Sequence, residues 1–179
     1  MIARTSTHAR ALPLPMVPVN TKKAERRTLR LATINDLLAD AERLTAAERE
    51  GRLRHTGNWS LGQALGHIAG WASTPYDGYP PSMPKPPRFV AFIFKFMKGR
   101  FLRKGLPAGI RMRGVEAGSL FTEPLSTDEG LARLQHAFER IRTTKPVHPN
   151  AVFGDMPREE IEQLNLRHAE LHLGFFHPR

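Results

Sequence analysis

Two histidines near the end of the chain have the spacing of a helical metal-binding pair. His168 and His172 are four residues apart, and on an α-helix this spacing brings both side chains to one face, with Cβ atoms about 5–6 Å apart. Two imidazoles in this arrangement can bind one divalent ion, but a catalytic zinc site has three protein ligands. The candidate for the third ligand is His67, far upstream in the chain. The sequence therefore predicts a metal site made of His67, His168 and His172.

The histidine pair by itself is a weak motif. Ala169 stands where an H-E-x-x-H metalloprotease carries its glutamate. An alternative is that both histidines lie on a polar helix face or are hydrogen-bonded in the core. His168, however, falls on the stripe that we expect this helix to bury, together with Ile161, Leu164, Leu171 and Phe175. Buried neutral imidazoles need hydrogen-bond partners or a metal, which favours the metal site.

Two further residues are candidates for contacts around this site. Gln63 lies one helical turn before His67, where it could hold a ligand in place or touch a substrate. His148 lies in a stiff Pro-Val-His-Pro turn, where it could lie near the metal or cap a helix end. The sequence offers no convincing general base, because Glu170 lies between the paired histidines but on a different helix face.

The composition limits the chemistry that is available. The chain has 179 residues and no cysteine, so it can form neither disulfides nor thiolate metal sites, and any thiol chemistry needs an external thiol. Its formal charge of +10 fits an arginine-rich surface, or a nucleic acid, anionic membrane or anionic substrate as partner. Nucleic acid is disfavoured, because the basic residues are spread along the chain and no nucleic-acid-binding motif is present.

Five stretches have the pattern of helices, which predicts an all-α fold. They cover residues 33–50, a stretch that begins at 60, residues 88–104, residues 126–143 and a stretch that begins near 157. Capping boxes mark three of the starts: Thr33 with Asp36, Ser60 with Gln63, and Ser126 with Glu129. Residues 75–87 are rich in proline and are predicted to form a loop that could close over the site.

The stretch 88–104 combines aromatic and basic residues. One interpretation is a helix on a membrane surface, with apolar residues on one side and cations on the other. The other is a well-buried helix whose cations reach out to solvent. We favour the buried helix, because Phe94 and Phe101 widen the apolar arc beyond the face of Phe89, Phe92 and Phe96. A membrane span is excluded, because charges recur every few residues.

The N-terminal residues 1–30 are predicted to be a poorly structured leader before a domain of residues 31–179. The apolar run 11–19 contains three prolines, which would break a helix, and it is too short to span a bilayer. Met16 is an alternative start to Met1.

Several of these residues together resemble a known superfamily. The pattern is Trp59-Ser60-Leu61-Gly62-Gln63 with His67, then His148-Pro149 and Phe153-Gly154, then the pair His168 and His172. It resembles the DinB/YfiT-like superfamily, and within it the DUF1569 group of bacterial proteins, over roughly residues 21–176.

The resemblance implies a four-helix bundle with a long crossover connection. It also implies that His67, His168 and His172 bind zinc or nickel at one end of the bundle, that relatives use external low-molecular-weight thiols, and that the chain can form a homodimer. The aromatic helix and the proline-rich loop are an insertion relative to the simpler bundles, so substrate access does not carry over.

Three functional hypotheses follow. The first is a metal-dependent enzyme, either a hydrolase or a low-molecular-weight-thiol transferase, acting on an unspecified small molecule. The second is a basic module that binds nucleic acid or membrane. The third is a metal-free bundle with a structural or ligand-binding role. We favour the first, with a cytoplasmic location, no nucleic-acid partner and no stable membrane anchor.

Overall fold

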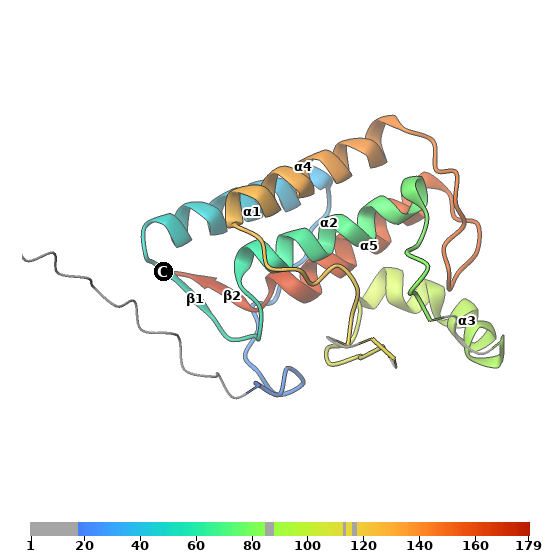
Figure 1. Ribbon diagram of the computed structural model, residues 1–179, viewed down its shortest axis with the longest axis horizontal. Helices are drawn as coiled ribbons and strands as arrows, with labels where there is room; N and C mark the ends of the chain where they lie inside the picture. The colour runs from blue at the N-terminus through green and yellow to red at the C-terminus, as the bar shows by residue number, and fades with distance from the viewer. Residues whose placement is uncertain (1–17, 85–87, 113, 116–117) are drawn as a thin grey trace, which may run out of the picture.

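The computed structural model describes residues 18–84, 88–112, 114–115 and 118–179. The described chain is mostly helical (Figure 1), which confirms the predicted class. Its elements in order are α1 (Ile34–Arg49), β1 (Leu53–His55), α2 (Leu61–Asp77), α3 (Arg88–Lys104), α4 (Thr127–Thr143), α5 (Arg158–Leu173) and β2 (Phe176–Pro178).

The helix starts agree closely with the predicted capping signals. At α1 the box is complete, because the Thr33 hydroxyl accepts from the Asp36 amide and the Asp36 carboxylate accepts from the Thr33 amide. At Ser60 and Ser126 only the hydroxyl half forms. The third-position side chains act elsewhere: Gln63 donates to the Thr122 carbonyl at 2.6 Å, and Glu129 accepts from Arg133. The prediction of complete boxes at these two starts was wrong.

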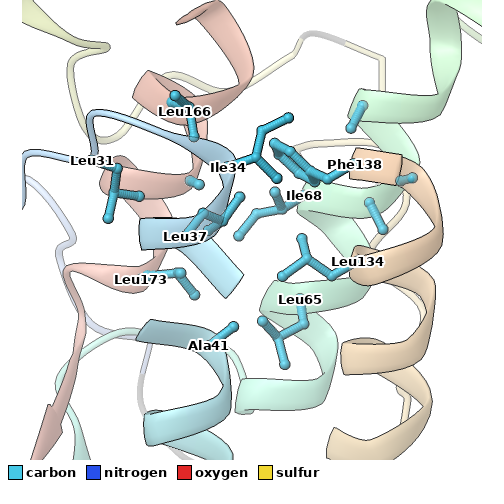
Figure 2. Close-up of a cluster of buried hydrophobic side chains, with 14 of the residues drawn as sticks. Leu31, Ile34, Leu37, Ala41, Leu65, Ile68, Leu134, Phe138, Leu166 and Leu173 are labelled. Carbon is cyan, nitrogen blue, oxygen red and sulfur yellow. The ribbon is translucent and has the colours of Figure 1, made fainter. Parts of the chain in front are cut away.

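Helices α1, α2, α4 and α5 pack around one core. Figure 2 shows its side chains converging from all four helices, with Leu37 from α1, Ile68 from α2, and Leu134 and Phe138 from α4. Each helix contributes apolar residues at helical spacing, so one stripe of each can be buried together. This core fixes the relative placement of α2 and α5, on which the histidines stand.

Helices α2 and α4 run parallel. Gly62 lies against Gly130 at their N-terminal ends, and Asp77 pairs with Arg140 at 2.8 Å at their C-terminal ends. Two parallel helices cannot be joined by a tight turn, so residues 78–126 must return along the length of the molecule. A long connection between these helices, which contains α3, is therefore a geometric necessity.

A stripe of glycines on α2 lets this returning chain lie directly on the helix. Gly62, Gly66 and Gly70 are one turn apart. A methyl group added at Gly62 would lie 2.6 Å from the carbonyl of Ser126, and one at Gly70 would lie 2.6 Å from Cβ of Phe121. Side chains at these positions would push residues 118–126 away from α2. The glycine stripe thus allows backbone carbonyls of this segment to reach α2 side chains.

Helix α2 continues to Asp77, beyond the point where the loop was predicted to begin. Pro75 has no amide hydrogen, so it cannot continue the hydrogen-bond ladder to the Trp71 carbonyl. The Thr74 hydroxyl donates to that carbonyl at 2.8 Å and supplies the missing partner. This local repair explains why the helix survives a proline in its last turn.

Helix α3 has the predicted bounds but not the predicted burial. It packs on α5 at the edge of the core, with Phe101 as part of the core and Lys98 paired with Glu160 at 2.6 Å. Phe94 is half-buried and Phe101 is buried, whereas Phe89, Phe92 and Phe96 are exposed. The expectation of a well-buried helix was wrong for this face. Among the described residues, none of the helices is both long and apolar enough to cross a membrane.

The chain before α1 is tied to the body of the protein. Residues 18–33 contain no helix or strand, yet the Arg27 amide donates to the Gly174 carbonyl at 2.7 Å. The buried Arg167 of α5 pairs with Glu170 at 2.9 Å and donates to the Leu31 carbonyl. Residues 1–17, which include most of the predicted leader and Met16, lie outside the described residues.

The short ribbon of β1 and β2 was not predicted. The strands pair antiparallel, with Arg54 opposite His177. Three residues per strand are too few for a recognisable alternating pattern. The ribbon joins the α1–α2 connection to the C-terminus and so brings the chain before α2 next to the end of α5.

We expect Gly62→Ala to lower the free energy of unfolding by about 1–3 kcal/mol, because the new methyl group meets rigid backbone. Gly66→Ala is the matched control. Its methyl group meets only the end of the Leu125 side chain, and the better helix propensity of alanine, about 1 kcal/mol, offsets the adjustment. Urea unfolding of both variants measures the difference, and equal stabilities would contradict the proposed role of the stripe.

We expect the stability of the folded protein to depend on pH through the carboxyl group of Asp40. Burial alone would raise the pKa of this carboxyl, but hydrogen bonds from Arg27 and Arg43 outweigh burial and lower the pKa below its ordinary value of 3.8. We expect Asp40→Asn to cost about 1.5–3 kcal/mol at pH 7. Because the folded-state pKa is lowered, the wild-type advantage is complete above pH 3.8 and is lost as the pH falls through the folded-state pKa.

The matched control is Asp128→Asn, since the pair of Asp128 with Arg49 is exposed and should contribute at most about 1 kcal/mol. Urea unfolding at several pH values measures both variants. A gap between wild type and Asp40→Asn that stays constant down to the lowest pH would contradict the assignment.

Candidate metal centre

The three predicted histidines meet where α2 and α5 pack against each other. His67 lies in the middle of α2, and His168 and His172 lie one turn apart on α5. The ring centroids are 5.0 Å apart for His67 and His168, 4.5 Å for His67 and His172, and 4.7 Å for the α5 pair. One nitrogen from each ring lies within 4.8 Å of the other two. The structure therefore brings together the residues that the sequence predicted as metal ligands.

A backbone carbonyl sets the orientation of His67. Its Nδ1 lies 2.8 Å from the Leu120 carbonyl oxygen, and since a carbonyl can only accept, Nδ1 carries the hydrogen. The lone pair of the neutral ring is then on Nε2, which points to Nε2 of His168 at 3.2 Å. Two nitrogens on a tetrahedral zinc ion, each about 2.0–2.1 Å from it, are about 3.3 Å apart. The separation of these two nitrogens thus matches one edge of such a site.

Burial keeps the three rings neutral. It lowers the pKa of His67 to about 4, although the Leu120 carbonyl opposes the shift. Burial, and then the neighbouring imidazoles, lower the pKa values of His168 and His172 well below the ordinary value. Neutral imidazole is the form that binds metal, so protons compete little with a metal at neutral pH.

Two tryptophans enclose the histidines. The Trp59 ring stacks on His172 with centroids 5.1 Å apart and an angle of 13° between the planes, and its centroid lies 4.7 Å from that of His67. Trp71 meets His67 and His168 edge-on, at 6.4 and 6.3 Å. These bulky rings hold the imidazoles in place and limit the access of water.

The site lies on the wall of a large cavity of about 1120 Å³. Much of its lining is apolar, and includes Phe94, Phe101, Phe153, Met156, Leu164 and Leu171. The expected core stripe on α5 was therefore only partly right, since Leu164 and Leu171 face the cavity. Leu166, Ala169 and Leu173 of α5 lie in the core instead. Helix α5 is covered on two sides, which a single apolar stripe cannot describe.

Of the other two predicted site residues, Gln63 supports the three histidines indirectly and His148 lies apart from them. Gln63 donates to the Thr122 carbonyl, in the same segment as Leu120, so it helps to hold the chain that orients His67. His148 is exposed and lies at the cavity wall, with its amide donating to the Pro75 carbonyl at 3.0 Å. Among the described residues, the cluster that could hold a metal contains the three histidines and not His148.

Sequence reasoning missed the Leu120 carbonyl and the packing role of Trp59. A backbone carbonyl has no signature in a sequence, so Leu120 could not have been identified. Trp59 could have been found from two signals: it opens the motif of the family resemblance, and it stands beside the Ser60 cap at the start of α2.

We expect nickel to quench the intrinsic fluorescence of the protein, because both tryptophans of the chain lie against the histidines. Titration of metal-free protein with Ni²⁺ should quench the emission at stoichiometric addition. The variant His67→Gln, whose amide can still donate to Leu120, should lose this response, while His136→Ala on the exposed face of α4 should keep it. The same quenching in wild type and His67→Gln would contradict a metal site at these rings.

Neither curated proteins nor solved structures gave a match to this chain. The family model described as "Protein of unknown function (DUF1569)" matches residues 23–179, which includes all five helices and the three histidines. The chain therefore belongs to the DUF1569 family.

Proposed function

We propose that this protein is a metal-dependent enzyme whose site is formed by His67, His168 and His172. The observation that carries the proposal is the convergence of three neutral imidazoles, with two facing nitrogens 3.2 Å apart, on the wall of a large cavity. Metal sites and substrate cavities that share a wall are typical of catalytic centres.

The donor set fits a divalent ion such as zinc or nickel. Three nitrogen donors with no thiolate suit either metal. When bound, such an ion would supply Lewis acidity and would activate a water molecule or a thiol as a nucleophile.

The residues of the chain have separable tasks. The Leu120 carbonyl holds His67 in the tautomer with its Nε2 lone pair toward the site. Trp59 and Trp71 pack on the rings and exclude water from one side. The apolar cavity walls bind the substrate mainly by burying its nonpolar surface. Polar or anionic groups of the substrate would meet Lys22 and Arg111, which also line the cavity.

Two reaction classes are consistent with this site, hydrolysis and transfer of a low-molecular-weight thiol. We infer that the fold is that of the DinB/YfiT-like superfamily, supported by the parallel α2 and α4 with a long connection and by the positions of the histidines. That relationship favours thiol transfer. The chain has no cysteine, so the thiol would be a co-substrate that enters the cavity.

A second candidate function is ligand binding without metal or catalysis. The observation in its favour is the size and apolar character of the cavity, which would hold a bulky organic molecule. In that case the contact between His67 and His168 is a hydrogen bond between two neutral rings. Metal content separates the two functions.

The first experiment is elemental mass spectrometry of protein purified without a nickel column. We expect about one zinc or nickel per chain in the wild type, since the three histidines form one site. His67→Ala and His172→Ala should each lose most of the metal, because two ligands bind far more weakly than three. His136→Ala is the matched control and should retain it, since His136 is exposed on α4.

Metal retention in His67→Ala at the wild-type level would contradict the site. A wild type that remains metal-free after incubation with zinc and nickel would contradict the enzyme proposal and favour the ligand-binding alternative. If the wild type binds metal and His67→Ala does not, the metal-loaded wild type should be screened with thiol and ester substrates, with His172→Ala as the inactive reference.

A further inference from the structure

We propose that the exposed face of α3 docks onto an anionic lipid surface. The face is a ridge of four large apolar side chains: Phe89, Phe92, Ile93 and Phe96, which are 69%, 62%, 53% and 76% exposed. Their spacing of three and four residues puts them on one side of the helix. An apolar ridge of this size on a surface indicates a partner.

The ridge is not the result of a loosely attached helix. The opposite side of α3 is bound to the protein, with Phe101 packed against Phe153 at 6.2 Å between centroids and Lys98 paired with Glu160 at 2.6 Å. Phe94 and Phe101 stack on each other and line the cavity. Figure 1 shows α3 at the edge of the molecule, outside the four packed helices. The phenyl groups of the ridge are therefore held outward on a fixed support.

The charge of α3 specifies the kind of partner. The helix contains six basic residues and no acidic one. Arg100 and Arg103 follow Phe96 by four and seven residues, so they extend the same face by two turns, and both are exposed. Lys95 and Lys104 are exposed on either side. Phenyl groups that insert between lipid chains, with cations at the level of the headgroups, are the arrangement of helices that lie on anionic membranes.

A second copy of the chain fits this face less well. In a symmetric dimer the same patch lies on both partners, so two strongly basic helices would meet with no acid on either of them. An anionic bilayer supplies the missing negative charge and adapts to a convex ridge. This inference is independent of the proposed metal chemistry, because none of the ridge side chains is a candidate ligand.

The test is co-sedimentation of the full chain with vesicles of phosphatidylcholine alone and with equal parts of phosphatidylglycerol. We expect binding to the mixed vesicles, much weaker binding to phosphatidylcholine alone, and a fall in binding as salt is raised. The double variant Phe92→Ser/Phe96→Ser should bind mixed vesicles roughly tenfold more weakly or worse, because two inserted phenyl groups are lost. Arg100→Gln/Arg103→Gln should abolish the preference for the anionic lipid.

Two variants serve as matched controls. Val147→Ser removes an exposed apolar side chain elsewhere, and Arg133→Gln removes an exposed cation from α4; both should bind as the wild type does. Circular dichroism of each variant reports the fold. Absence of vesicle binding, or equal binding by wild type and Phe92→Ser/Phe96→Ser, overturns the proposal. Concentration-dependent dimerisation that the phenylalanine variant abolishes, without vesicle binding, would also overturn it and assign the ridge to a second copy.

Discussion

The close packing of residues 118–126 on α2 is the constraint on which the site depends. It depends on Gly62 and Gly70, because a side chain at either position would meet the backbone of Leu125 and Ser126 or the side chain of Phe121. The same segment then presents the Leu120 carbonyl to His67 and the Thr122 carbonyl to Gln63. A structural feature of helix packing thus selects the tautomer of a candidate metal ligand, through two glycines that let the segment lie close to the helix.

Helix α5 belongs both to the hydrophobic core and to the wall of the cavity that holds the candidate site. One side lies in the core through Leu166, Ala169 and Leu173. Another side turns His168 and His172 to the cavity. A third side holds the chain before α1: Arg167 and Glu170 pair within α5, and together they bind the backbone of Leu31, whose carbonyl accepts from Arg167 and whose amide donates to Glu170. A buried pair of this kind is weak evidence for stability by itself, but here it fixes where the N-terminal segment crosses the helix. The ligands therefore stand on an element that is restrained around most of its circumference.

The ends and identities of the helices could be predicted well, because their signals are local. Thr33, Ser60 and Ser126 each cap the helix that they were expected to begin. Two predictions failed because of contacts that neither capping signals nor apolar spacing describes. Pro75 remains in α2 because a hydroxyl replaces its missing amide hydrogen. Phe89, Phe92 and Phe96 are exposed because α3 lies at the edge of the core and buries only its other side. Periodicity indicates which residues share a face, but not what that face meets.

By itself the sequence determined the helical class, the absence of thiolate ligands, and the three histidines as a candidate ligand set, since residue type and helical spacing are properties of the chain alone. Only the tertiary structure decided that His67 meets the α5 pair, because that contact depends on the antiparallel packing of two helices far apart in sequence. It also decided that Leu120 orients His67 and that Gln63 is turned to Thr122. These contacts come from how close two backbones can approach, which is set by the packing of the whole molecule and not by any local pattern.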